Sequence, residues 1–148
     1  MTTAVMFGHG NLAVFALGGE PGPIDGTAYA VPAADQSRLA DLQFSSVPPA
    51  TAIPESVAIQ VAKTHYDPAR LGAKTVEAYL ATVTETAADR VGQPLRDRPI
   101  WIVKMAGFSV AGESVLNAGL NRKVHFLTVL YVVLDAETGD FLYGEWQE

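Results

Sequence analysis

The chain ends in two strand-forming runs joined by a tight turn, and this pair constrains the fold more than any other feature. Residues 124–134 are rich in β-branched and aromatic side chains, which favours a strand inside a sheet, and residues 141–146 return as a second strand. In the turn at 135–140, Asp135 can accept backbone N–H bonds and Gly139 can adopt a positive φ. The sequence therefore predicts an antiparallel sheet in its C-terminal half.

A helix and a further strand are predicted before this hairpin. Pro54 suits the start of a helix, and apolar residues then recur at helical spacing over residues 55–65. Pro68 follows the helix, and the residue before a proline avoids the α region, so we expect the helix to end there. Residues 99–106 are mainly apolar and are expected to form a central strand.

The segment between these elements is ambiguous, because its apolar spacing fits a helix while its β-branched content fits a strand. We predict a strand over residues 75–83. A helical turn is then expected over residues 85–91, with Thr84 as its N-cap and Gly92 as its stop.

The first 54 residues show little periodicity. Residues 1–20 contain short strand candidates at 5–7 and 13–15, and we expect a folded strand or hairpin there rather than a signal peptide, because no positive charge precedes the apolar run. Residues 21–54 hold six of the nine prolines and are predicted to form an extended surface segment. The whole chain, residues 1–148, is expected to be one α+β domain with its regular core at 55–148.

Composition excludes several classes of function. The ten Lys and Arg residues are scattered in a chain of net charge −6, which argues against a nucleic-acid surface. No apolar run reaches the roughly 20 residues of a membrane span. The absence of cysteine removes disulfides, thiol nucleophiles and Cys zinc sites, and the three histidines are too isolated to predict a metal site, so no cofactor is expected.

Two segments imitate catalytic or nucleotide-binding motifs. Residues 8–13 follow a short apolar run as a dinucleotide-binding turn would, but the helix and second strand of that motif are missing, which favours a plain glycine turn. Residues 107–111 place Ser109 after a strand, as in a nucleophile elbow, yet no histidine follows an acid late in the chain. We predict no catalytic residue, and the chain is interpreted as a non-enzyme rather than an enzyme.

Candidate binding residues come from the surplus of aromatic side chains on the last three strands. One helix can cover only one face of a sheet, so the other face meets the N-terminal segment, lines a groove or meets a partner. His125 begins a strand, where a buried, hydrogen-bonded histidine is the simplest interpretation. The candidate binding residues are Trp101, His125, Tyr131, Tyr143 and Trp146.

The order of helix and strands, together with residues 98–103, Gly107 and residues 131–142, resembles the small PepSY-like domains. The similar region covers roughly residues 55–148. The resemblance implies a PepSY-like or cystatin-like architecture, in which a short helix packs on an antiparallel sheet. It also implies a non-catalytic binding or inhibitory module of the cell envelope or of secreted proteins; without it, a cytoplasmic location is expected.

Three functions follow as expectations. The first is a protein-binding or inhibitory module that acts through an exposed sheet face or edge. The second is a small-molecule or hydrolytic site in a cone-like sheet, with a groove lined by Trp101, His125 and Tyr131. The third is a structural subunit that associates with copies of itself.

Overall fold

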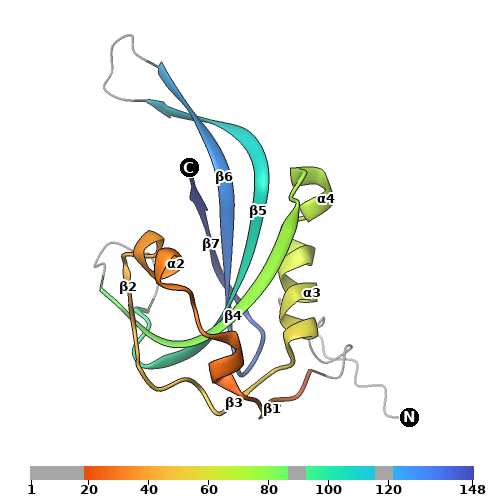
Figure 1. The fold of residues 1–148 in the computed structure, drawn as a ribbon, viewed down its shortest axis with the longest axis vertical. Helices are drawn as coiled ribbons and strands as arrows, with labels where there is room; N and C mark the ends of the chain where they lie inside the picture. The colour runs from red at the N-terminus through yellow and green to blue at the C-terminus, as the bar shows by residue number, and fades with distance from the viewer. Residues whose placement is uncertain (1–18, 87–92, 116–121) are drawn as a thin grey trace.

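The protein is a mixed α+β structure built on a curled antiparallel sheet (Figure 1). The computed structural model describes residues 19–86, 93–115 and 122–148. Its helices are the 3₁₀ helix η1 (Gly26–Tyr29) and the α-helices α2 (Ala33–Arg38), α3 (Glu55–His65) and α4 (Pro68–Leu71). Its strands are β1 (Gly22–Pro23), β2 (Leu42–Phe44), β3 (Thr51–Ala52), β4 (Thr75–Glu85), β5 (Arg98–Val115), β6 (Arg122–Asp135) and β7 (Phe141–Gln147). The large sheet has the order β2-β4-β5-β6-β7, and β1 pairs with β3 alone.

The regular elements predicted for residues 55–148 are mostly confirmed. The helix α3 has the predicted bounds, and β4 and β5 extend beyond the predicted 75–83 and 99–106. The predicted end of the helix before Pro68 is confirmed, because α3 ends at His65 and Asp67 is extended. Pro68 then begins the short helix α4, where the side chain of Asp67 accepts the N–H of Ala69 at 2.9 Å and proline suits the first position of a helix. One detail was wrong: Glu85 ends β4 and pairs with Leu42 of β2, rather than starting a helical turn.

Parts of the earlier predictions concern residues outside the described ranges. The strand candidates at 5–7 and 13–15 lie there, and so does most of the turn expected at 85–91.

The turn between β6 and β7 is confirmed at its two predicted residues. The carboxylate of Asp135 accepts the backbone N–H groups of Glu137 and Thr138, each at 2.8 Å. Gly139 has φ of 77°, in the left-handed region that favours glycine. The other carboxylate oxygen of Asp135 accepts a bond from Arg98 Nε at 2.7 Å, which ties the turn to the start of β5.

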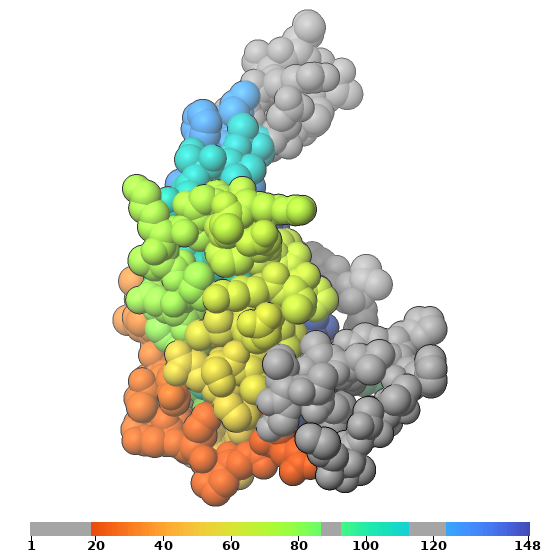
Figure 2. Space-filling view, turned by 90° about the vertical axis from the view of Figure 1, so that its right-hand side faces the viewer, coloured from red at the N-terminus to blue at the C-terminus, as the bar shows by residue number. Residues whose placement is uncertain are grey.

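One face of the sheet, which we call the helix face, packs against α3. The inward residues of α3 are Val57, Ala58, Val61 and Ala62, at the spacing of one helix stripe. They meet alternate residues of the central strands, which include Trp101, Val103, Met105, Leu130, Val132 and Leu134. Figure 2 shows the helices α3 and α4 in yellow and green over this side of the molecule.

The opposite face, which we call the cover face, is closed by part of the segment predicted to be extended. Residues 21–54 instead form several short elements, and Val31, Leu39 and Leu42 are buried. They pack against a second set of alternate sheet residues, which includes Ile100, Ile102, Val129, Tyr131 and Val133. The prediction of a plain extended segment was wrong because a few well-spaced apolar residues suffice to dock short elements on a sheet face.

The β5–β6 pair extends beyond its neighbours as an arm (Figure 1). Pairing between β4 and β5 stops at Ala106, and pairing between β6 and β7 stops at Val129. Beyond these points β5 and β6 pair with each other as far as Val115 and Arg122. An irregularity between Ala106 and Val110, with Gly107 at φ of 84°, marks the base of the arm as a β-bulge.

Candidate functional site

The edge of β6 along the arm has no neighbouring strand within the described part of the chain. The last pair between β6 and β7 joins Val129 to Gln147, whereas β6 starts at Arg122. Residues 124–128 therefore present one edge of the strand past the end of β7. Unpaired strand edges of this kind are ready templates for a further strand.

The hydrogen-bonding groups on this edge belong to Leu127 and His125. At the other end of β6, the N–H of Asp135 bonds toward β7 and the N–H of Ala136 bonds toward β5. The bonding direction alternates along an antiparallel strand, so odd-numbered residues of β6 point their N–H and C=O groups toward the β7 side. Each of Leu127 and His125 therefore offers one donor and one acceptor to a strand placed beyond β7.

A hollow of about 670 Å³ lies at the same place, where β7 ends beside β6. Side chains from both faces of the sheet reach it, because it lies past the end of a strand. Its lining residues are Arg38, Gly112, His125, Leu127, Trp146, Gln147 and Glu148.

Trp146 forms an apolar wall of the hollow and is held by two other rings. Its centroid lies 5.7 Å from that of Tyr66, with the ring planes at 87°. Phe108 makes a second edge-to-face contact at 5.9 Å and 82°. Such pairs add stability beyond the burial of area, so the orientation of the half-buried Trp146 is fixed by its neighbours.

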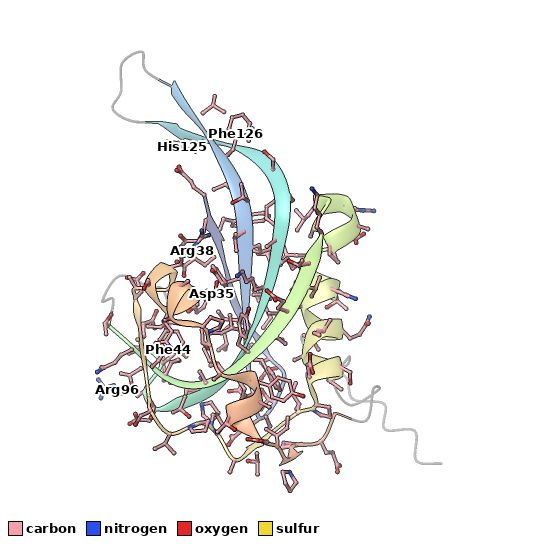
Figure 3. All side chains as sticks on the ribbon, in the orientation of Figure 1. Asp35, Arg38, Phe44, Arg96, His125 and Phe126 are labelled. Atoms are coloured by element: carbon pink, nitrogen blue, oxygen red, sulfur yellow. The ribbon has the colours of Figure 1, made fainter. Side chains whose placement is uncertain are left out.

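Arg38 reaches the hollow because a buried polar cluster holds α2 on the cover face. Asp35 of α2 is 3% exposed and accepts a hydrogen bond from the Tyr131 hydroxyl at 2.6 Å. The Nζ of Lys104 lies 2.8 Å from the same carboxylate oxygen. A buried charge needs a partner of this kind, and here the pairing fixes α2 and so the position of Arg38 at its C-terminal end (Figure 3).

The ionisation of this cluster follows from its contacts. Burial alone would raise the pKa of Asp35, but hydrogen bonds from Lys104 and Tyr131 and the charges of Lys104 and Arg38 outweigh it, so the pKa lies below its ordinary value. Burial and the Asp35 carboxylate raise the pKa of Tyr131. Asp35 is therefore a carboxylate and Tyr131 a neutral donor at neutral pH.

The chain already places one carboxylate in the hollow. Nδ1 of His125 contacts Oε1 of Glu148, and the side chains are 24% and 65% exposed, respectively. The backbone oxygen of Glu148 accepts a long bond from Arg38 at 3.4 Å, and Gln147 donates to the Arg38 carbonyl at 3.0 Å. Contacts this exposed are weak and can be exchanged for others.

The other side of the arm is apolar and exposed. Val124 and Phe126 are 52% and 59% exposed. They alternate with His125 and Leu127 along β6, so they face the opposite side of the strand. Figure 3 shows His125 and Phe126 on β6 where it extends beyond β7.

The structure brings together only two of the five residues predicted to bind. His125 and Trp146 line the hollow. Trp101 and Tyr131 are fully buried on opposite faces of the sheet, so the two do not line a common groove with His125. Tyr143 is half-buried beside the cover-face cluster.

The buried residues owe their positions to hydrogen bonds that the sequence does not reveal. Trp101 donates from Nε1 to the carbonyl of Ile53 at 2.9 Å, and Tyr131 donates to Asp35. Aromatic rings with a satisfied polar atom fit the core well.

Sequence reasoning missed Arg38, Leu127 and the Asp35–Lys104 pair. Arg38 and Asp35 lie in the segment predicted to be extended, so no pattern placed them against the sheet. Lys104 could have been found from the sequence, because it is the only charged residue in the apolar run 99–106, where a buried carboxylate partner is expected.

Ser109 and the possible metal ligands were the remaining candidates for chemistry in the described residues. Ser109 lies exposed within the β5 bulge, and no hydrogen bond joins it to a described histidine or carboxylate. No group of three or more His, Asp or Glu residues in residues 19–86, 93–115 and 122–148 converges as a metal site would require. Among the same residues, no helix has the length and apolar character needed to cross a membrane.

Comparison with known proteins adds no relative. No family model matches the chain, and neither a curated protein nor a solved structure is found to be similar to it.

Proposed function

We propose that this protein is a non-catalytic binding module that takes an extended segment of a protein partner as an added strand on the edge of β6. The single observation that carries the proposal is that β6 continues past the end of β7, with a hollow beside the unpaired edge. Strand addition uses main-chain hydrogen bonds for affinity and side-chain pockets for specificity, and this site offers both.

Both faces of the sheet body are covered by other parts of the chain, which supports a strand edge rather than a sheet face as the binding surface. In the body of the sheet, α3 occupies the helix face, and residues 31–39 with the edge strand β2 close the cover face. The arm is different, because Val124 and Phe126 expose large apolar side chains there. A partner strand beside β6 would bury part of this apolar area.

The arrangement of α3 across a meander of four antiparallel strands supports a PepSY-like or cystatin-like assignment, which we also propose. The resemblance of residues 98–103 and 131–142 to PepSY-like domains points to the same kind of function, a binding or inhibitory module. Under this assignment the arm and the segment before α3 are additions specific to this chain.

The test uses peptides selected without bias. A library of displayed random peptides is panned against the full chain, and the affinities of the recovered peptides are measured by fluorescence anisotropy. Leu127→Pro removes the outward N–H while leaving the bonds from β6 to β5, and Leu127→Ala removes the same side chain but keeps the N–H. We expect Leu127→Pro to weaken binding about tenfold or more and Leu127→Ala to weaken it less.

A folding control and a second measurement accompany this test. Circular dichroism and thermal unfolding show whether Leu127→Pro folds. If it does not, slower amide exchange at Leu127 and His125 in the wild-type protein on peptide addition replaces the variant. Equal affinity of the peptides for folded Leu127→Pro and Leu127→Ala would contradict strand addition.

A small apolar ligand is a second candidate, favoured by the size of the hollow and by the fixed ring of Trp146. Volumes of about 300–1,000 Å³ are usual for ligand sites. Such a ligand would quench the fluorescence of Trp146 and would bind Leu127→Pro and Leu127→Ala alike. A partner strand would discriminate between these variants, so the same pair separates the two candidates.

A further inference from the structure

We infer that the partner strand bears an acidic residue opposite His125 and apolar residues opposite Val124 and Phe126. This inference rests on the proposed function and gives the chemistry of the segment that the β6 edge would select. It combines the register of the sheet with the charge and exposure of the side chains on the arm.

The register follows from the way β7 pairs with β6. Gln147 lies opposite Val129, and the two strands are antiparallel. A strand that continues the line of β7 in the same direction meets Leu127 first and His125 two residues later. Side chains directly opposite each other in an antiparallel pair lie on the same face, so the residue opposite His125 faces the hollow.

The hollow provides positive charge for that residue. Arg38, whose guanidinium is always charged, lines it beside His125. The structure already pairs His125 with a carboxylate, that of Glu148. An acidic side chain from a partner strand would make the same contact, and opposite charges directly across a strand pair are favourable.

The residues on either side of the acidic one face the other side of the strand. There they would lie opposite Phe126 and Val124, which are exposed and apolar. Aromatic and β-branched cross-strand pairs stabilise a sheet, and each apolar contact removes area from water. The partner segment therefore alternates apolar and acidic residues.

Glu148 would act as an internal competitor for this segment. Its side chain is 65% exposed, so its contact with His125 contributes little to folding and can be replaced. Removal of the Glu148 carboxylate should leave His125 and Arg38 free to contact a partner carboxylate without disturbing the sheet.

The test uses three short capped peptides and the full chain. The first alternates valine and glutamate, the second has glutamine at each glutamate, and the third has lysine there. Anisotropy titrations should show the glutamate peptide binding roughly three- to fivefold more tightly than the glutamine peptide, and the lysine peptide binding most weakly.

Variants assign this preference to the hollow. His125→Gln should remove most of the preference for glutamate over glutamine, whereas His65→Gln, at the exposed end of α3, should keep it. Glu148→Gln should tighten binding of the glutamate peptide roughly twofold, and Glu137→Gln, in the distant β6–β7 turn, should leave it unchanged.

The outcomes separate this inference from the proposed function. Equal binding of the glutamate and glutamine peptides, with both weakened by Leu127→Pro relative to Leu127→Ala, would overturn the acidic preference and leave strand addition intact. A preference that survives in His125→Gln would also overturn the inference. Binding that is insensitive to Leu127→Pro would overturn strand addition itself.

Discussion

Two aspartates fix distant parts of this molecule, and they do so by different means. One carboxylate oxygen of Asp135 acts locally, because the N–H groups that it accepts come from the next few residues of its own turn, while the other oxygen accepts the bond from Arg98. Asp35 works across the fold, because its partners Lys104 and Tyr131 lie on the sheet. A local contact of the first kind can be predicted from a sequence window, and a long-range contact of the second kind cannot.

The turn gives the first prediction. Gly139 has φ of 77°, which a β-branched side chain adopts only with strain. We expect Gly139→Val to lower the free energy of unfolding by about 1–3 kcal/mol, measured by urea denaturation. Gly139→Asn is the control and should lose less, because asparagine tolerates the left-handed region; equal stability of the valine variant and wild type would contradict the assignment.

The buried cluster gives the second prediction. Asp35→Asn leaves Lys104 without its nearest carboxylate and should cost about 2 kcal/mol at neutral pH. The folded state lowers the pKa of Asp35 below the unfolded value of 3.8, so its contribution is fully present above that value and is lost as the pH falls through the folded pKa.

The measurement for Asp35 is urea unfolding of wild type and Asp35→Asn at pH 7 and near pH 3. The difference in free energy should be largest at pH 7 and should shrink at the acidic pH. The exposed Glu137→Gln serves as a control with little change at pH 7. A difference that is constant with pH would show that the charge of Asp35 does not hold α2 in place.

At the scale of elements, the sequence predicted what depends on periodicity and turn chemistry. The helix α3 and the strands of the C-terminal sheet follow from these signals. The packing of α2 on the sheet could not be predicted from these signals. Its six residues are too few for a periodic pattern, and the residue that holds it, Lys104, lies far away in the sequence. The arm could not be predicted either, because only the pairing of the strands shows that β7 ends opposite Val129 and leaves the first residues of β6 without a partner on that side among the described residues.

Long-range contacts also limit how far the binding site can be predicted from the sequence. His125 and Trp146 could be chosen as aromatic residues on terminal strands, and both line the hollow. Trp101 and Tyr131 had the same signal and lie in the core. Strand alternation alone does not say which face is covered, so it cannot separate a binding ring from a core ring.

The arm yields a prediction about stability. Phe126 is 59% exposed, so Phe126→Ser should change the free energy of unfolding by no more than about 0.5 kcal/mol. The same change should weaken binding of selected peptides severalfold, because a cross-strand apolar contact is lost. Loss of the fold in Phe126→Ser, seen by circular dichroism, would show that the ring supports the structure instead.

The whole molecule combines a well-covered body with an open arm. The body buries both faces of its sheet, one under α3 and the other under residues 31–39 with the edge strand β2. Within the part of the chain that the structure describes, the arm leaves one edge of β6 and two apolar side chains open to a partner. The buried Asp35–Lys104 pair links these regions, because it fixes the helix that places Arg38 at the base of the arm.

Amide hydrogen exchange is the most direct test of strand addition at the β6 edge. Exchange at each residue of β6 is measured by NMR in the free wild-type protein and with a saturating selected peptide. We expect exchange of the outward amides of Leu127 and His125 to slow by about tenfold or more, while exchange of the Phe126 amide, which already bonds to β5, changes little. Bound peptide with no slowing of exchange at Leu127 and His125 would contradict strand addition at this edge.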